Sequence, residues 1–355
     1  MIKTVVVCEA QVPFIRGGAE ALVSELVLQF RNYGFETERV SLPFKWYPKS
    51  EVLAHAGAWR LLDLSESNGR PIDLLVGTKF PTYFARHPRK VTWLVHQHRA
   101  AYELVGTPYS DFEHDEHDLA LRDRLIALDT AMLGECRGIF SISATISARL
   151  QRYNGLHSTP LYHPPRLADR LHAAPAGNYV LSLGRLETVK RVDLAIRAML
   201  HTAPSLSLKV AGTGSQREAL ERLAESLGLG SRVQFLGEVN DDEAIELFAG
   251  ALAVVFPPYD EDYGYVTLEA FLARKPVITT TDAGGPLEFV EDGVNGLVAA
   301  PSPDAVADAI ARLAADASAA ARLGEAGHAR ARLISWDGVV EQLMAAARSG
   351  VASAG

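Results

Sequence analysis

The sequence predicts an α/β protein of two doubly wound parallel-sheet domains that face each other across a cleft. The chain has 355 residues and is 48% hydrophobic, enough for two domains that each bury a core. Apolar runs typical of strands covered on both faces alternate with helical patterns along the chain. The stretch YHPP at 162–165 breaks this series near its middle, because a double proline continues neither a helix nor a central strand.

The first domain is expected to span residues 1–165. It opens with TVVVC at 4–8, a β-branched run without polar interruption, which predicts a buried strand. GGAEALVSELVLQFRNYG follows at 17–34, with apolar residues at helical spacing and a closing glycine. Strand patterns then recur in DLLVGT, KVTWLVH and GIFSIS, so strands and helices alternate to the end of the domain.

The second domain is expected to span residues 166–335. It opens with the strand pattern NYVLSLGRLE and the helical pattern RVDLAIRAML. Further strands are predicted in LSLKVAGTGS, RVQFLGEV, ALAVVFPPY, KPVITTTD and NGLVAA. The tail, residues 336–350, is amphipathic and is expected to form a helix that packs back on the first domain.

Composition excludes several classes of function. The formal net charge is -8, its acidic excess falls after residue 165, and no basic stripe predicts a nucleic-acid partner. The start of the chain has no signal-peptide pattern, and no apolar run is long enough to span a bilayer. Cys8 and Cys136 are expected to be core thiols, so a cytoplasmic protein is predicted. The basic cluster RHPRK, residues 86–90, is either a solvated loop or a peripheral contact with the inner face of a membrane or an anionic acceptor.

The stretch EDYGYVTLE places Glu261 before a helix and Glu269 inside it. The helix is predicted to begin near Gly264 or Tyr265, where unpaired N–H groups and the helix dipole favour an anion such as phosphate. A helical wheel puts Glu269 on the apolar side, where a carboxylate needs a partner, and sugar hydroxyls would satisfy both acids. The alternative is that Glu261 is a solvated loop charge and Glu269 a local cap or salt bridge.

Two cations are predicted at the same sheet edge. Arg185 ends a strand and Lys190 begins the next helix, so both fall at the carboxyl edge, where open α/β sheets bind ligands. They could neutralise a diphosphate leaving group without a metal. Lys190 and Arg191 as ordinary surface residues of a first helical turn remain the alternative.

Taken together, these segments resemble the family 4 (GT4) retaining glycosyltransferases, whose GT-B fold consists of two Rossmann-like domains. The resemblance covers nearly the whole chain and its motifs are specific as a set. They are GGAE at 17–20, GRLETVKR at 184–191, AGTGS at 211–215, VQFLGEV at 233–239, the E-x7-E of 261–269, GGPLEFVEDGVNGLV at 284–298 and SW at 335–336.

The resemblance implies that the second domain holds a nucleoside-diphosphate sugar. Arg185 and Lys190 would then grip the diphosphate, Glu269 would bind ribose and Glu261 would face the donor sugar. Glu238 and Val239 would lie near the base. Further donor contacts are implied at Gly17 and Gly18, which would close over the phosphates, and at Gly264, Tyr265, Val266, Thr267 and Leu268.

The resemblance also implies the chemistry. His96 would lie by the donor sugar as part of the catalytic set with Glu261, Arg185 and Lys190, and His98 and Arg99 would face the acceptor. The family transfers a hexose with retention, usually explained by front-side attack without a protein nucleophile, and no metal or other cofactor is expected. The acceptor would be a glycan or lipid-linked hydroxyl, as in bacterial polysaccharide or glycolipid assembly. Where the family commonly has phenylalanine before Gly264, this chain has Tyr263, which leaves the sugar open.

Other functions stay open on the residues alone. A nucleotide-sugar epimerase of the same fold would also bind a diphosphate between two such domains. DED at 260–262 is a DxD sequence, the metal-binding signature of another glycosyltransferase fold. DFEHDEHD at 111–118 contains HxxH but no distant third ligand, which favours a solvated helix start over a metal site. GTGSQREAL weakly resembles a dinucleotide-binding turn, but the third glycine is missing.

Overall fold

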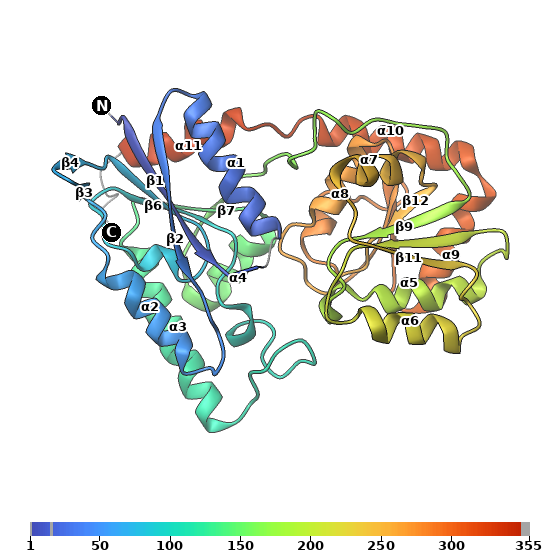
Figure 1. Cartoon of the computed structure of the whole chain (residues 1–355), viewed down its shortest axis with the longest axis horizontal. Helices are drawn as coiled ribbons and strands as arrows, with labels where there is room; N and C mark the ends of the chain where they lie inside the picture. The colour runs from blue at the N-terminus through green and yellow to red at the C-terminus, as the bar shows by residue number, and fades with distance from the viewer. Residues whose placement is uncertain (1, 15–16, 349–355) are drawn as a thin grey trace. The chain divides into compact units, whose positions relative to one another are not determined.

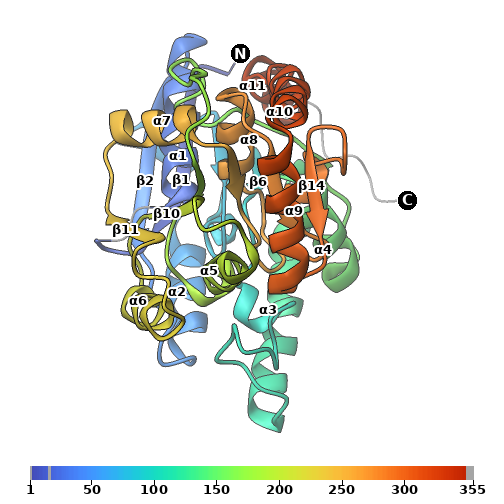
Figure 2. The ribbon, with the colours of Figure 1, turned by 90° about the vertical axis from the view of Figure 1, so that its right-hand side faces the viewer.

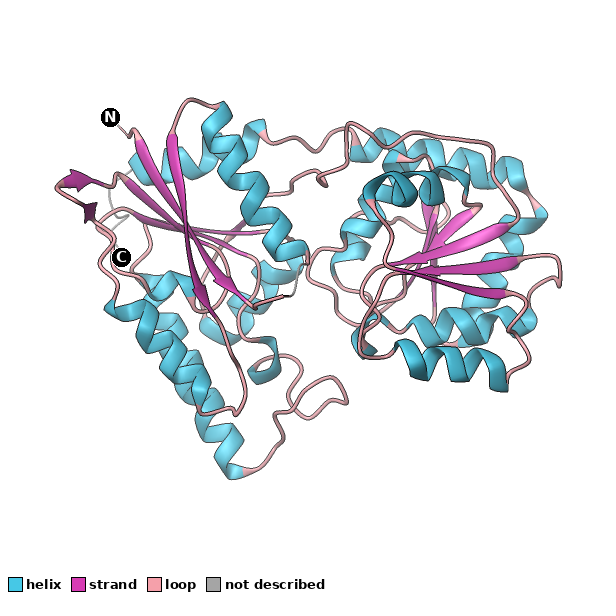
Figure 3. Cartoon of the chain, in the orientation of Figure 1, coloured by secondary structure: helices cyan, strands magenta, loops and turns pink. Residues whose placement is uncertain are grey.

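The computed structural model describes residues 2–14 and 17–348, and the chain divides into two compact units. The first comprises Met1–His163 with Ser335–Gly355, and the second comprises Pro164–Ile334. The sequence analysis set the boundary two residues later, at 165. Each unit contains a parallel sheet with helices packed on it, as Figure 3 shows by element type. Among the described residues, no helix combines the length and apolar character that crossing a bilayer requires.

The first unit has a six-stranded sheet in the order β2-β1-β5-β6-β7-β8, with every neighbouring pair parallel. The order changes direction between β1 and β5, so the loops after these two strands leave toward opposite faces and open a crevice between them. The strands are β1 (Thr4–Gln11), β2 (Glu36–Pro43), β5 (Leu74–Gly77), β6 (Lys90–Leu94), β7 (Gly138–Ser141) and β8 (Thr159–Pro160), with a separate hairpin of β3 (Glu66–Ser67) and β4 (Arg70–Pro71).

The sequence analysis did not predict β2, because that strand lies at the edge of the sheet. Its sequence ETERVSLP is largely exposed, with Thr37 the buried position, so it lacks the apolar run of a central strand. Helices α1 (Gly18–Asn32), α4 (Ala144–Asn154) and α11 (Asp337–Arg348) contact strands of the sheet, while α2 (Glu51–Leu61) and α3 (Glu116–Gly134) pack on the 3₁₀ turn η1 (Thr82–Phe84) (Figure 1). A second 3₁₀ turn, η2 (Arg99–Ala101), contacts α3.

The last helix, α11, belongs to the first unit. It contacts β6 and β7, and the Tyr33 hydroxyl at the end of α1 donates to the Asp337 carboxylate at its start. Its apolar side buries Val339, Val340 and Leu343. The tail therefore forms the helix expected for 336–350, although residues 349 and 350 lie outside the described residues.

The second unit repeats the architecture in the order β11-β10-β9-β12-β13-β14, again with parallel pairs. Its order changes direction between β9 and β12. The strands are β9 (Tyr179–Leu183), β10 (Ser207–Ala211), β11 (Val233–Gly237), β12 (Ala253–Val255), β13 (Val277–Thr280) and β14 (Gly296–Ala299). The helices, labelled in Figures 1 and 2, are α5 (Val192–Ala198), α6 (Arg217–Ser226), α7 (Asp241–Gly250), α8 (Tyr265–Leu272), α9 (Pro303–Ala315) and α10 (Ala317–Ala331). The 3₁₀ turns are η3 (Thr188–Lys190), η4 (Met199–His201) and η5 (Gly285–Glu288).

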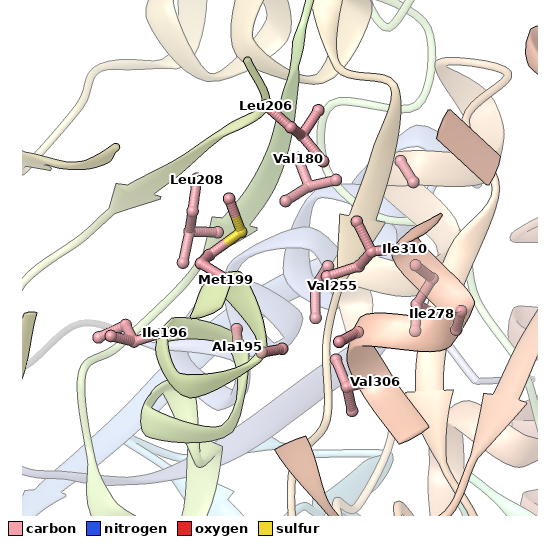
Figure 4. Close-up of a cluster of buried hydrophobic side chains, with 14 of the residues drawn as sticks. Val180, Ala195, Ile196, Met199, Leu206, Leu208, Val255, Ile278, Val306 and Ile310 are labelled. Atoms are coloured by element: carbon pink, nitrogen blue, oxygen red, sulfur yellow. The ribbon is translucent and has the colours of Figure 1, made fainter. Parts of the chain in front are cut away.

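One face of the second sheet packs on α5 and α9 (Figure 4). Met199 at the end of α5 and Ile310 of α9 lie against strand residues such as Val180 and Ile278, and all four are fully buried. These side chains are aliphatic and supply the apolar area that holds the unit together. Because the core fixes the strands, the loops after them are free to carry polar groups.

Candidate functional site

The candidate site lies where the strand order of the second sheet changes direction. Arg185 and Lys190 follow β9, while Glu261 and α8 follow β12, its neighbour on the other side. Both loops leave the carboxyl ends of parallel strands, and this position is where open α/β sheets bind ligands. The predicted donor-side residues of this unit are therefore gathered at one edge of one sheet.

Lys190 and Glu261 form an ion pair across this switch point. The Lys190 Nζ donates to Glu261 Oε2, and the two side chains keep only 15% and 16% of their surface exposed. Lys190 Nζ also lies 5.9 Å from the centre of the Phe256 ring. The pair thus joins the lysine predicted to bind the diphosphate and the carboxylate predicted to face the donor sugar, which lie 71 residues apart in the sequence.

The backbone around Glu261 is fixed by the loop after β13. Its N–H donates to the Ala283 carbonyl at 2.8 Å, and its own carbonyl accepts from the Gly285 N–H at 2.7 Å. Gly284 has φ 73°, and a Cβ there would lie 2.6 Å from the Glu261 carbonyl oxygen. Only glycine fits this contact, so the GGP of the sequence holds Glu261 in place.

Helix α8 begins at Tyr265 with Gly264 as its N-cap, which confirms the predicted helix start. Gly264 has φ 86°, and a Cβ at this position would meet the Pro286 ring at 2.8 Å. No side-chain hydrogen bond caps this helix start within the described residues, and its dipole favours an anion there. The Thr267 N–H donates to the Gly264 carbonyl at 2.9 Å. Thr267 in this first turn is fully buried, and its hydroxyl has no hydrogen-bond partner in the part of the chain that the structure describes.

Val266 and Leu268 of the same turn are buried, whereas Tyr265 keeps part of its surface exposed. Tyr263 is 2% exposed, and its ring packs 5.3 Å from that of Phe289. Its ring also lies 5.2 Å from that of Tyr265. Tyr263 therefore packs between Phe289 and Tyr265 and holds the start of α8 against the rest of the unit.

Glu269 lies one turn into α8. Burial raises the pKa of its carboxyl to about 7, with a smaller lowering by Arg166 and a smaller raising by Asp241. Arg166 and Asp241 are themselves bonded, at 2.5 and 2.8 Å. Glu269 therefore sits on the apolar side of its helix, as the wheel predicted, and near a charged pair that the sequence analysis did not identify.

Arg185 is exposed and no hydrogen bond or ion pair of its side chain is found within the described residues, so its guanidinium is open to a ligand. Glu238, also exposed, and Val239, half-buried, follow β11 at the same sheet edge. The loops after β9 and β10 approach each other closely here, because a Cβ on Gly212 would lie 1.9 Å from the Gly184 carbonyl oxygen. The sheet edge beside Arg185 is therefore built of glycine turns that no side chain could replace.

The first unit has its own charged pair at a switch point. Gly17 is the N-cap of α1 and Gly18 its first residue, directly after the undescribed residues 15 and 16. Glu20 accepts from the Gly17 N–H at 2.9 Å and from Lys79 Nζ at 2.7 Å. Burial alone would raise the pKa of Glu20, but Lys79 and the backbone hold it below its usual value. Lys79, after β5, was missed from the sequence because its partner lies 59 residues away.

The predicted acceptor-side residues follow β6. His96 bonds through Nδ1 to the Gln97 carbonyl at 2.6 Å. Burial, with a smaller contribution from His96, lowers the pKa of His98 to about 4, and its Nε2 has no hydrogen-bond partner among the described residues. Arg99 is paired with Glu103, which also lies 3.2 Å from Arg149. His98 is therefore a buried imidazole whose lowered pKa favours its neutral form, while Arg99 is held in a local ion-pair network.

The acidic cluster DFEHDEHD is mostly exposed and starts α3, as expected, but it and the basic cluster RHPRK each contain one buried charged residue. Asp118 of DFEHDEHD is 2% exposed and accepts from Lys49 at 2.6 Å, while Asp115 caps α3. Lys90 of RHPRK is 1% exposed and bonds to Glu135 at 3.0 Å, so it does not face solvent. Among residues 2–14 and 17–348, no group of three or more His, Cys, Asp or Glu side chains is arranged to hold a metal ion.

The second unit is similar to known glycosyltransferases. Residues 168–330 match the family model of glycosyl transferases group 1. A D-inositol 3-phosphate glycosyltransferase of Mycolicibacterium paratuberculosis is 37% identical over 179 residues, which cover 48% of this chain and 40% of the relative. The human alpha-1,3/1,6-mannosyltransferase ALG2 is 31% identical over 169 residues, covering 43% and 40%. The aligned part thus spans about two fifths of these relatives' own length.

Solved structures extend the likeness to both units. A sucrose-phosphate synthase of Thermosynechococcus elongatus superposes with a TM-score of 0.75 at 19% identity, covering 97% of this chain and 98% of that one. The Anabaena protein HepE, solved with UDP and glucose, gives 0.71 at 17% identity over 96% and 98%. At such identities the likeness establishes the fold, which is GT-B with two Rossmann-like units.

Proposed function

We propose that this chain is a retaining hexosyltransferase of GT4 type that uses a GDP- or UDP-linked sugar, because residues 168–330 match the family model of glycosyl transferases group 1. The observation that carries the proposal is the Lys190–Glu261 pair at the switch point, beside the uncapped start of α8. A diphosphate at that helix start would meet the N–H groups and Lys190. Arg185, which has an open guanidinium, would add the second cation.

These positions support the following reaction. The bond between the sugar C1 and the diphosphate oxygen breaks, and its electron pair leaves with the diphosphate. The acceptor oxygen bonds to C1 from the same face and its proton passes to a leaving phosphate oxygen, so retention needs no protein nucleophile. Lys190 and Arg185 lower the barrier because the negative charge grows on the diphosphate in the transition state. Neither side chain requires a metal for this, and we propose metal-independent transfer.

The remaining residues have roles in binding. Glu269 would accept from ribose hydroxyls, Glu261 from donor-sugar hydroxyls, and Glu238 and Val239 would lie beside the base. The complex of HepE with UDP and glucose supports a uridine donor, while the mannosyltransferase relative leaves guanosine open. His96 would contact the donor sugar and His98 the acceptor, a glycan or lipid-linked hydroxyl in bacterial polysaccharide or glycolipid assembly.

Peripheral membrane contact at the cytoplasmic face is a separate part of the proposal. Of the RHPRK cluster, Lys90 is buried, which leaves Arg86 and Arg89 to meet anionic headgroups. The parent protein should co-sediment with phosphatidylglycerol vesicles, and the variant with both arginines changed to Ala should stay in the supernatant. If the parent stays in the supernatant, or the variant still pellets, the membrane part fails.

A thermal-shift panel tests the donor class. UDP or GDP should raise the unfolding temperature with or without EDTA, while NAD should not. A shift by NAD alone would refute the transferase proposal, and a UDP or GDP shift that EDTA abolishes would point to a bound divalent ion. With the donor so identified, NMR of the glycoside product tests retention of the anomeric configuration. Conversion of the donor to its epimer without any acceptor would instead support the epimerase alternative.

A further inference from the structure

Arg191, next to Lys190, connects three loops of the candidate site. Its Nε donates to the Pro257 carbonyl at 2.9 Å and its Nη2 to the Pro258 carbonyl at 2.7 Å, both after β12. The same guanidinium donates to the Thr280 hydroxyl at 2.9 Å and to both Asp282 carboxylate oxygens at 2.7 and 2.9 Å, at and after the end of β13. The residue itself follows β9 and η3. One side chain therefore joins the carboxyl-edge loops of three neighbouring strands.

The backbone of Arg191 adds a second observation. Its φ of 49° and ψ of 42° lie in the left-handed region, where L residues with a Cβ are strained and glycine is not. The turn between η3 and α5 would thus be made at lower cost by glycine. The arginine side chain is only 11% exposed, so it is committed to its five bonds and is not a surface charge. The turn itself does not require an arginine, so the hydrogen bonds of the guanidinium are the reason for this residue.

The bonds of Arg191 run parallel to backbone contacts that hold Glu261. The Tyr259 N–H donates to the Val189 carbonyl at 2.8 Å, which joins the β12 loop to the residue before Lys190. The Asp260 N–H donates to the Asp282 carbonyl at 2.9 Å, beside the carboxylate that Arg191 grips. Both segments that carry the Lys190–Glu261 pair are therefore tied to Arg191 or to its direct partners.

We propose that Arg191 is a positioning residue that fixes the Lys190–Glu261 pair at the switch point. The role in turnover rests on the proposed function; the role in geometry does not. Without the guanidinium, the loops after β12 and β13 keep their backbone hydrogen bonds but lose the side-chain anchor that they share with the turn after β9, so the separation of Lys190 and Glu261 is less tightly held. A displacement of about 1 Å at a reacting centre can cost up to about 10²-fold in rate.

The chain offers a matched control in Arg232, at the opposite edge of the same sheet. Its guanidinium also donates to five oxygen atoms, including the Met199 carbonyl at 2.8 Å and the Thr202 hydroxyl at 2.7 Å. Arg232 directly precedes β11, at the amino end of the strand. Its loss removes equivalent bonds from the same unit without touching the candidate site.

The test compares Arg191→Gly, Arg191→Lys and Arg232→Ala with the parent. Glycine relieves the left-handed backbone, so R191G should fold. Crystal structures should show the Lys190–Glu261 ion pair broken in R191G and intact in R232A. With a hexosyl donor, kcat of R191G should fall by roughly tenfold to 10²-fold with a smaller change in KM. R191K should recover part of this loss, and R232A should stay within about twofold while its unfolding temperature falls.

Two results would overturn the inference. An intact Lys190–Glu261 ion pair in the R191G crystal structure refutes the geometric role, whatever the activity of the protein. Equal kinetic constants for R191G and R232A would show that Arg191 contributes only to folding. If the parent transfers no sugar from any donor, the proposed function fails, but the crystal structures still decide the role of Arg191.

Discussion

Replacing Glu269 by Gln should stabilise the ligand-free protein at alkaline pH while weakening donor binding. Burial raises the pKa of this carboxyl to about 7 from its ordinary value of 4.5. When the pKa of an acid is higher in the folded state than in the unfolded state, its contribution to the free energy of unfolding is most favourable at pH values below the pKa of the unfolded state. Its contribution is lost as the pH rises toward 7, because the folded protein must then hold a buried charge. Glutamine has the same shape and never carries that charge.

The size of the effect follows from the shift. A difference of about 2.5 pKa units corresponds to about 3 kcal/mol above pH 7, and the part of Glu269 that stays exposed reduces this to about 2 kcal/mol. E269Q should therefore gain about 2 kcal/mol in free energy of unfolding at about pH 8. The gain should shrink to less than half at about pH 5.5. For units of this size, it corresponds to about 4–8 °C in unfolding temperature at the higher pH.

The assay is urea denaturation of the ligand-free protein at both pH values. Asp308→Asn is the control, because Asp308 is an exposed carboxylate in the middle of α9 that should change stability little at either pH. Equal stabilisation of E269Q at both pH values, or destabilisation at pH 8, would refute the reasoning. Calorimetry with UDP and GDP completes the test: E269Q should bind the preferred nucleotide about tenfold more weakly, because a ribose hydroxyl loses its charged acceptor.

Three further predictions concern the charged pairs and a glycine. Lys190→Met should lower kcat/KM by about 10²-fold in donor turnover, and unchanged turnover would remove Lys190 from the site. Gly284→Ala should destabilise by about 2–4 kcal/mol in denaturant unfolding, since its Cβ would lie 2.6 Å from the Glu261 carbonyl oxygen at φ 73°. Lys79→Met should lower stability at neutral pH. Because the pKa of Glu20 is lowered in the folded protein, the Lys79–Glu20 pair stabilises the fold at pH values above the pKa of Glu20 in the unfolded chain. This stabilisation is lost as the pH falls through the pKa of Glu20 in the folded protein, so a loss of stability in K79M that does not depend on pH would contradict the prediction.

Local patterns predicted those parts of the site whose causes are local. The start of α8 could be read from a glycine followed by an apolar helical run, and the partly buried position of Glu269 from its place on the helical wheel. The carboxyl edge of the sheet, where Arg185 and Lys190 lie, was predicted from the alternation of strand and helix patterns in the sequence. In each case the signal and the structure lie within a few residues of each other.

The parts that were missed depend on distant partners. Arg191 looked like a surface residue because its acceptors include backbone carbonyls of the loop after β12, which leave no trace in the side-chain pattern. Lys90 looked like part of a basic loop, but it begins β6, and Glu135, which pairs with it, lies 45 residues away. Arg166 and Asp241 approach Glu269 only because the linker and the start of α7 meet in the folded second unit.

The two sheets share an arrangement that explains why charged pairs lie at their switch points. Lys79 meets Glu20 where the order of the first sheet changes direction, and Lys190 meets Glu261 where that of the second does. A partly buried ion pair is a weak source of stability, because desolvation offsets most of the Coulomb attraction. The same pair is useful beside a polyanion, because the lysine keeps its charge and its donors in place before the ligand arrives. At the second switch point, a diphosphate that pairs with Lys190 in place of Glu261 would free the Glu261 carboxylate to accept from sugar hydroxyls. Binding of the diphosphate would therefore also provide the hydrogen-bond acceptor for the donor sugar.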